Sequence, residues 1–125
     1  MQLTKTDFIQ YLRCPNSLWL AKRDPDSCPP GEFSSFLQKL IADGYLVERY
    51  VRKLFEARND GANVSFQSTF QTDTGLFARA DVFENAQGQT HLFEVKSSTS
   101  VKTDREHDHI KDACFQLVAA ERSGQ

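Results

Sequence analysis

Residues 91–98 combine strand-like apolar side chains with two opposite charges, and they read His91-Leu92-Phe93-Glu94-Val95-Lys96-Ser97-Ser98. In a strand, alternate side chains point to opposite faces, so Glu94 and Lys96 would share one face while Val95 takes the other. We therefore predict a strand over this stretch, with a carboxylate and an ammonium group side by side on one face.

The segment that precedes it has the same strand-like character, and it reads Leu76-Phe77-Ala78-Arg79-Ala80-Asp81-Val82-Phe83. Residues 85–89 between the two form a predicted turn with a glycine available for positive φ. A hairpin of these two strands would bring Asp81 close to Glu94 and Lys96. Two acids and a lysine on one sheet face suggest a divalent-metal site with a cationic helper, which is suited to hydrolysing a phosphodiester.

The composition is that of one folded domain. The 125 residues are 39% hydrophobic and 26% charged, which is ordinary for a globular protein. We predict a single domain over residues 1–125, with N-terminal helices and a loop in 1–31 and a core in 32–125. The sequence has neither an apolar run of the roughly 20 residues that span a bilayer nor a signal peptide, so we expect no membrane contact and a cytoplasmic location.

Charge and cysteine content narrow the function classes. The three cysteines are widely spaced and predict neither a disulfide framework nor a four-thiolate metal site. The net charge of −2 counts against DNA binding, because DNA-binding proteins usually carry a basic face. Bound divalent cations would offset clustered acids, and a local basic stripe would still attract DNA. The candidate DNA contacts are Arg49, Arg52, Lys53 and Lys102.

Helices are expected in three regions. A short helix begins at Thr4 or Thr6, and Pro15 either stops it or begins the next turn. A long helix is expected over residues 34–58, where Gly44 either breaks the helix or marks the close approach of another group. A last helix is expected over residues 108–122.

A strand is also expected over residues 63–72, which gives three consecutive strands joined by short turns. Such connectivity predicts an antiparallel meander. Helices packed on a small sheet then give a mixed α/β or α+β sandwich.

The hairpin residues can be assigned chemical roles. Asp81, Glu94 and the backbone carbonyl of Val95 would supply the oxygen ligands that Mg²⁺ and Mn²⁺ prefer. Lys96 would orient the attacking water and stabilise the charge that develops on phosphorus. The alternative is a cross-strand salt bridge on a solvated face, which is common for such residues. Apolar neighbours such as Phe83 would partly desolvate these charges. Desolvating charges is costly, so their presence here favours a functional role, the metal site.

Ala80-Asp81 followed by Glu94-Val95-Lys96 resembles the motif of the PD-(D/E)XK nuclease superfamily. Residues 44–48 of the long helix, Gly-Tyr-Leu-Val-Glu, are similar to the Gly-x-x-x-His element of RecB-like and CRISPR-associated exonucleases, with Glu48 in place of the His. The resemblance implies that Glu48 is a metal ligand or a partner of a metal-bound water. From the residues alone, a surface pair with Arg52 at i+4 is equally open.

Two further motifs extend the resemblance. Residues 112–117 are similar to the RecB-like motif in which a Gln follows the catalytic strand, and Gln116 lies on the apolar stripe of its helix. The resemblance implies that Gln116 positions Lys96 or a phosphate. Cys14-Pro15 resembles the start of iron–sulfur members, but the three other cysteines of those members are missing. We therefore expect no iron–sulfur cluster, and Cys14 to be a buried thiol or a relic of a longer protein.

The resemblance implies a restriction-endonuclease-like α/β core, a small mixed sheet with an antiparallel three-strand meander flanked by helices. It also implies a Mg²⁺- or Mn²⁺-dependent deoxyribonuclease of the exonuclease type, acting in DNA repair, recombination or defence. Such a core normally has a further parallel strand after the last helix, so we expect a truncated or minimal domain, completed by a homodimer or protein partner. The alternative is a catalytically inactive nuclease-fold domain that binds DNA or a protein partner, and a purely structural protein comes third.

Overall fold

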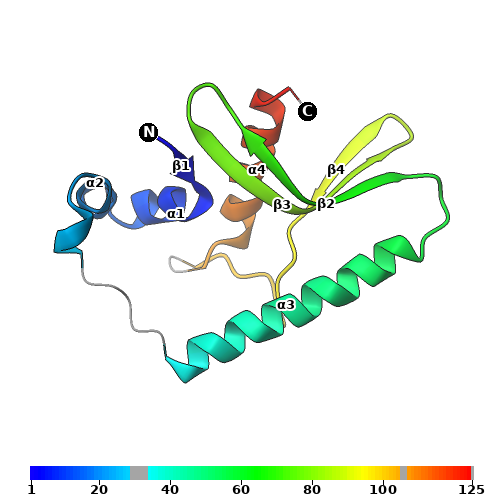
Figure 1. Cartoon of the computed structure of the whole chain (residues 1–125), viewed down its shortest axis with the longest axis horizontal. Coiled ribbons are helices and arrows are strands. Elements are labelled where there is room, and N and C mark those ends of the chain that lie inside the picture. Colours follow the sequence, from blue (N-terminus) through cyan, green and yellow to red (C-terminus); the bar gives the residue numbers. More distant parts are fainter. Residues whose placement is uncertain (29–33, 105–106, 125) are drawn as a thin grey trace. The chain divides into compact units, whose positions relative to one another are not determined.

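The computed structural model describes residues 1–28, 34–104 and 107–124. Within these ranges the chain is a mixed α/β protein with four α-helices and a small open sheet of four strands, which confirms the predicted α/β class and mixed sheet. The elements in chain order are β1 (Leu3–Thr4), α1 (Lys5–Arg13), α2 (Pro15–Arg23), the 3₁₀ helix η1 (Pro25–Ser27), α3 (Ser35–Glu56), β2 (Asn63–Gln71), β3 (Leu76–Ala86), β4 (Gln89–Phe93) and α4 (His109–Arg122) (Figure 1).

Strand β3 is the strand with which the three others pair. β2 reaches it through the turn that ends at Gly75, and β4 pairs with it antiparallel, so the predicted meander is present. β1 adds a parallel pairing, in which Leu3 is opposite Leu76 and Thr4 is opposite Phe77. No strand was predicted at β1, because two residues are too few to show a periodic pattern.

The chain divides into two compact units. The first unit comprises Met1–Glu32, Phe70–Ala78 and Val101–Gln125, and the second unit comprises Phe33–Thr69 and Arg79–Ser100. The buried apolar side chains of the first unit are Phe70, Ala78, Phe115, Ala119 and Ala120, and those of the second unit are Ala80, Val82 and Phe83. The single domain with a boundary near residue 31 stays a prediction.

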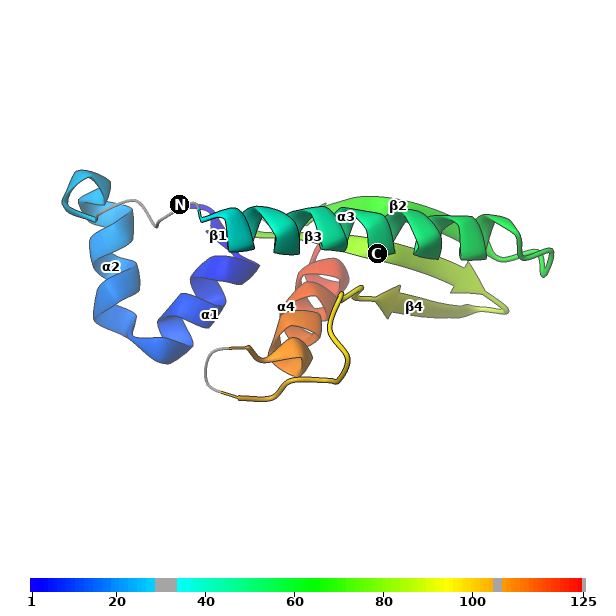
Figure 2. The ribbon, with the colours of Figure 1, turned by 90° about the horizontal axis from the view of Figure 1, so that it is seen from below.

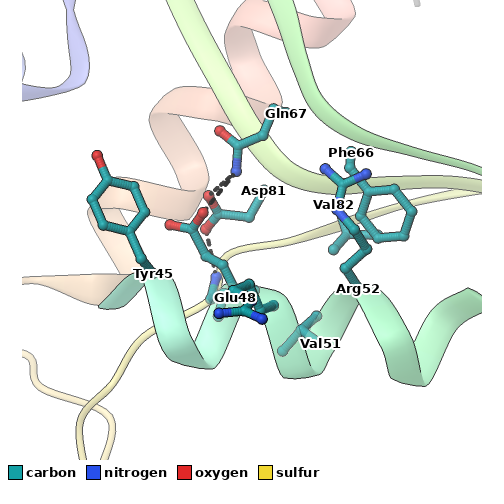
Figure 3. Close-up of a pocket in the computed structure, with 10 residues that line it drawn as sticks. Tyr45, Glu48, Val51, Arg52, Phe66, Gln67, Asp81 and Val82 are labelled. Carbon is teal, nitrogen blue, oxygen red and sulfur yellow. Dashed lines mark hydrogen bonds between the residues drawn. The ribbon is translucent and has the colours of Figure 1, made fainter. Parts of the chain in front are cut away.

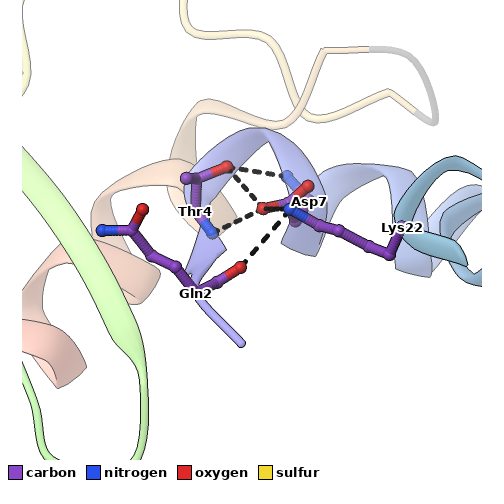
Figure 4. Close-up of polar contacts among 4 residues, drawn as sticks. All are labelled: Gln2, Thr4, Asp7 and Lys22. Carbon is purple, nitrogen blue, oxygen red and sulfur yellow. Dashed lines mark hydrogen bonds and ion pairs between the residues drawn. The ribbon is translucent and has the colours of Figure 1, made fainter. Parts of the chain in front are cut away.

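In the first unit, α1 and α2 meet at an angle (Figure 2). Thr4 caps α1 in a capping box with Asp7, and Pro15 is the first residue of α2, where its missing N–H costs nothing. Asp7 Oδ2 accepts hydrogen bonds from the Thr4 backbone N–H (2.7 Å) and hydroxyl (2.8 Å) and from Lys22 Nζ of α2 (2.8 Å), while Lys22 also reaches the Gln2 carbonyl (Figure 4). These bonds tie α2 to the start of α1.

Cys14 lies between α1 and α2, where it ends one helix and precedes the other. It is exposed, so the expectation of a buried thiol is wrong. Its extended backbone (φ −159°) interrupts the helical path between α1 and α2. No described helix is sufficiently long and apolar to pass through a membrane.

In the second unit, α3 is held to the sheet through its C-terminal half. The ring of Phe55 packs edge-on against Phe93 of β4 and Phe66 of β2, with centroid distances of 5.1 and 6.4 Å. Just beyond the helix, Arg58 Nη1 pairs with the buried carboxylate of Glu84 on β3 at 2.8 Å. These contacts fix the face of α3 that carries Glu48.

α3 continues unbroken past Gly44 (Figure 2). A Cβ placed on Gly44 would meet nothing within 4 Å among the described residues. The predicted helix break is therefore wrong, and no described residue makes the predicted close approach. The helical hydrogen bonds on either side outweigh the roughly 1 kcal/mol that a glycine costs in a helix interior.

Strand β4 ends at Phe93, so the predicted strand over residues 91–98 is too long. The last pair in the β3–β4 register is Val82 with Phe93, and the next would be Asp81 with Glu94. Instead, the Val95 N–H donates to the Asp81 carboxylate at 2.7 Å, which replaces a ladder hydrogen bond and ends the strand. Glu94, Val95 and Lys96 consequently lie on an irregular segment directly after β4.

The turn between β3 and β4 is tighter than predicted. It consists of Gln87 and Gly88, whose φ values are 51° and 77°, because β3 continues to Ala86 and β4 starts at Gln89. Two successive positive φ values are typical of the type I′ turn, whose twist matches that of a hairpin.

Candidate functional site

A pocket of about 230 Å³ opens in the second unit (Figure 3). It is lined by one face of α3, by the middle of β2 and β3, and by the segment after β4. The lining residues are Tyr45, Glu48, Arg49, Val51, Arg52, Phe66, Gln67, Asp81, Val82 and Val95.

Two carboxylates from different elements meet in this pocket. Glu48 projects from α3 and Asp81 from β3, and both accept a hydrogen bond from the side-chain amide of Gln67. The distances from Gln67 Nε2 to Glu48 Oε2 and to Asp81 Oδ1 are both 3.3 Å. The two carboxylate oxygens are therefore separated by no more than twice that distance. Two of the predicted site residues are thus brought together.

Gln67 is the residue that the sequence analysis missed. It lies inside β2 with a φ of 54°, the left-handed conformation that non-glycine residues rarely adopt and that is typical of a β-bulge. Next to it, the hydroxyls of Ser65 and Ser68 are 2.7 Å apart. The sequence carried only a weak signal, because the apolar alternation of β2 is loose and glutamine does not mark a positive φ.

Val95 takes part in the site through its backbone N–H, which donates to Asp81 Oδ2 at 2.7 Å. The predicted role used the Val95 carbonyl as a metal ligand, and this role stays a prediction. The hydrogen bond holds the Asp81 carboxylate in place from the side opposite Gln67, since each oxygen of the carboxylate has its own donor.

Glu94 and Lys96 flank Val95 and pair with each other, with 2.7 Å between Glu94 Oε1 and Lys96 Nζ. The Glu94 side chain is only 7% exposed and that of Lys96 30%. The expected neighbouring carboxylate and ammonium group are therefore present, and they are joined within one segment. Neither side chain belongs to the described lining of the pocket.

Gln116 lies on α4 in the first unit, whereas the pocket lies in the second. Its side chain is fully buried, at 0% exposure, beside Phe115, Ala119 and Ala120 on the same helix. The expected burial of Gln116 is therefore confirmed. Its action on Lys96 or a phosphate stays a prediction.

The predicted DNA contacts are divided between the units. Arg49 and Arg52 line the pocket, and the Arg52 guanidinium lies 4.3 Å from the centre of the Phe66 ring, a cation–π contact. Lys53 is exposed on α3. Lys102 belongs to the first unit, where its backbone N–H donates to His109 Nδ1 at 3.1 Å.

The donor set of the pocket fits a small divalent cation. Mg²⁺ takes oxygen ligands at about 2.0–2.1 Å and usually binds through one or two carboxylates while keeping several waters. Glu48 and Asp81 supply two such carboxylates. One oxygen of each is close enough to the other to accept a hydrogen bond from the same Gln67 amide group. No cluster of three or more His, Cys, Asp or Glu side chains suited to a metal occurs within residues 1–28, 34–104 and 107–124. Water and backbone oxygens would complete the coordination.

No family model, curated protein or solved structure matches the chain. The resemblance to the PD-(D/E)XK superfamily accordingly stays a prediction, based on the motif residues themselves.

Proposed function

We propose that the chain is a Mg²⁺- or Mn²⁺-dependent deoxyribonuclease with a site of the PD-(D/E)XK kind. The observation that carries the proposal is the convergence of Glu48 and Asp81, from α3 and β3, on one point of a pocket that Arg49 and Arg52 also line. Carboxylates suit the metal, and arginines suit the phosphates of the substrate.

Glu48 and Asp81 hold the ion in this proposal, with the Val95 N–H fixing the orientation of the Asp81 carboxylate. When bound, the ion would supply Lewis acidity toward the phosphate and the attacking water. In the hydrolysis, a bond forms between the water oxygen and phosphorus while one P–O bond of the DNA backbone breaks. A proton from the water passes through solvent to the leaving oxygen.

Lys96 follows Val95 directly and carries a positive charge. Its ion pair with Glu94 restricts the movement of that charge. We assign it the orientation of the water and the stabilisation of charge on the phosphate. Glu94 is a further ligand of the ion or a partner of Lys96. Gln116 positions Lys96 or a phosphate, as the motif implies.

The remaining parts of the proposal come from the resemblance. They are a restriction-endonuclease-like core, exonuclease action, a role in DNA repair, recombination or defence, and completion of the domain by a homodimer or protein partner. Arg49 and Arg52 are the DNA contacts with structural support, because both line the pocket. Lys53 and Lys102 are proposed as outer contacts, and no iron–sulfur cluster is proposed.

A second candidate function is a catalytically inactive nuclease-fold domain that binds DNA or a protein partner. The observation that favours it is the Glu94–Lys96 ion pair, because both side chains engage each other outside the described pocket lining. An inactive domain would retain the arginines of α3 as an anion-binding surface and would bind DNA without a divalent ion.

Two variants test the assigned roles. We expect Glu48→Gln and Lys96→Ala each to lower the rate of Mn²⁺-dependent cleavage of end-labelled DNA by about 100-fold or more, since each removes a charge that acts on the transition state. Circular dichroism should show an unchanged fold, because Glu48 is only partly buried and the Lys96 side chain is 30% exposed.

Glu56→Gln is the matched control, since Glu56 is an exposed glutamate at the end of the same helix and outside the pocket lining. Its cleavage rate should equal that of the wild type. Equal rates for Glu48→Gln, Glu56→Gln and the wild type would rule out a catalytic role for Glu48. DNA binding without cleavage in all proteins would favour the inactive domain.

A further inference from the structure

We propose that Gln67 is a positioning residue that holds Glu48 and Asp81 together in the metal-free protein and is displaced when Mg²⁺ or Mn²⁺ enters. This inference rests on the proposed function and adds a step to it: metal binding has to break the contacts of a side chain that is bonded to the same two carboxylates.

The Gln67 amide group is bonded to the same two carboxylate oxygens that an ion would use. Nε2 is 3.3 Å from Glu48 Oε2 and 3.3 Å from Asp81 Oδ1, so one NH₂ group donates to both carboxylates. An ion bound by the same two oxygens would need to be within about 2.1 Å of each. The amide group and the ion would therefore compete for the same two oxygens.

The backbone of Gln67 adopts an unfavourable conformation where its side chain enters the pocket. A φ of 54° inside a strand is unfavourable for a residue with a Cβ. The left-handed conformation interrupts the alternation of β2 and directs the residue into the pocket, where Figure 3 shows its amide group facing Asp81 and Glu48.

The consequence for metal affinity has a definite sign. The two hydrogen bonds of Gln67 use the oxygens that would bind the ion, so they oppose metal binding. Without the amide group, the two carboxylates would lose the donor that Gln67 shares between them, and a cation would reduce the repulsion between their charges. Removing the side chain is therefore expected to tighten metal binding, whereas removing a ligand or a merely structural residue would weaken it or leave it unchanged.

The experiment is titration of the full chain with MnCl₂ by isothermal calorimetry, comparing the wild type with Gln67→Gly. Glycine accepts the positive φ without strain, so the variant loses the amide group while keeping the backbone. We expect its dissociation constant for Mn²⁺ to be about three- to tenfold lower than that of the wild type, the range expected for one displaced hydrogen-bonded group.

Gln87→Gly is the matched control. Gln87 is also a glutamine at positive φ, 51°, but it lies in the β3–β4 turn and outside the pocket lining, so its affinity should equal that of the wild type. Gln67→Asn is a second variant, which retracts the amide by one methylene group and keeps a residue that tolerates positive φ. It should also bind more tightly, and circular dichroism reports whether each variant is folded.

The outcomes separate the two proposals. Tighter binding in Gln67→Gly and Gln67→Asn, or binding in these variants alone, supports the displacement of Gln67. Unchanged or weaker binding in both folded variants, with binding by the wild type, overturns the inference and leaves the proposed function standing. A complete absence of Mn²⁺ binding in the wild type and both variants overturns both.

Discussion

The surroundings of Asp7 determine the pKa of its carboxyl group. Burial alone would raise the pKa of its carboxyl group, but hydrogen bonds from Lys22 and from Thr4 more than offset burial and hold the pKa below its ordinary value. The folded state therefore favours the ionised form (Figure 4).

A pH dependence of stability follows, and Asp7→Asn reveals it. Because the pKa of Asp7 is lower in the folded than in the unfolded chain, its stabilisation is fully present above about pH 4 and is lost as the pH falls through the lowered pKa. Thermal melts should show the wild type above Asp7→Asn at pH 5–7, with the difference shrinking at lower pH.

The control for this series is Asp26→Asn, which alters an exposed carboxylate in η1 of the same unit. Its melting temperature should follow that of the wild type at every pH. A difference between wild type and Asp7→Asn that stays constant from pH 2 to pH 7 would contradict the assigned ionic role of Asp7.

At the level of residues, the sequence was sufficient to propose Glu48 and Asp81 but not the residue between them. A carboxylate is a candidate metal ligand by its residue type alone, and the spacing of the motif residues is visible in the sequence. Gln67 acts through a backbone conformation that its residue type does not encode, since positive φ values are expected at Gly, Asn or Asp. Its role becomes visible only when α3, β2 and β3 are placed together.

At the level of elements, α3 should tolerate and benefit from a side chain at Gly44. Gly44→Ala adds a methyl group that meets nothing within 4 Å in the described structure, and it removes the conformational freedom of a glycine in a helix. We expect it to raise the free energy of unfolding by about 0.5–1 kcal/mol in urea titrations.

Gly88→Ala gives the opposite prediction and serves as the comparison. Gly88 also has open space around a Cβ, but its φ is 77°, so an alanine would be strained. It should lower the free energy of unfolding by about 1 kcal/mol. Destabilisation by Gly44→Ala, with the second result as expected, would show that Gly44 has a packing role that the described residues do not reveal.

The helices were more predictable than the ends of the strands. Thr4, Asp7 and Pro15 mark helix starts through local hydrogen bonds and a missing N–H, and such signals can be read from sequence. The end of β4 depends on the Val95 N–H reaching Asp81, a contact between residues on different strands. β1 depends on pairing with Leu76 and Phe77, far along the chain, and no local pattern specifies it.

At the level of the whole molecule, the mixed α/β class followed from the order of helices and strands, whereas the division into two units did not. β2 and β3 each contribute residues to both units, so the division cannot be seen as a boundary in the sequence. Glu48, Gln67, Asp81 and Val95 all belong to the second unit. The proposed metal pair is therefore contained in one unit.

The most direct test of the central claim is cleavage of end-labelled single- and double-stranded DNA by the wild-type chain after removal of metals with EDTA. We predict no cleavage in EDTA, cleavage on addition of Mn²⁺ or Mg²⁺, and no cleavage by a folded Asp81→Asn variant under the same conditions. An inert wild type with either ion, or equal cleavage by Asp81→Asn, would contradict the assignment of a metal-dependent nuclease.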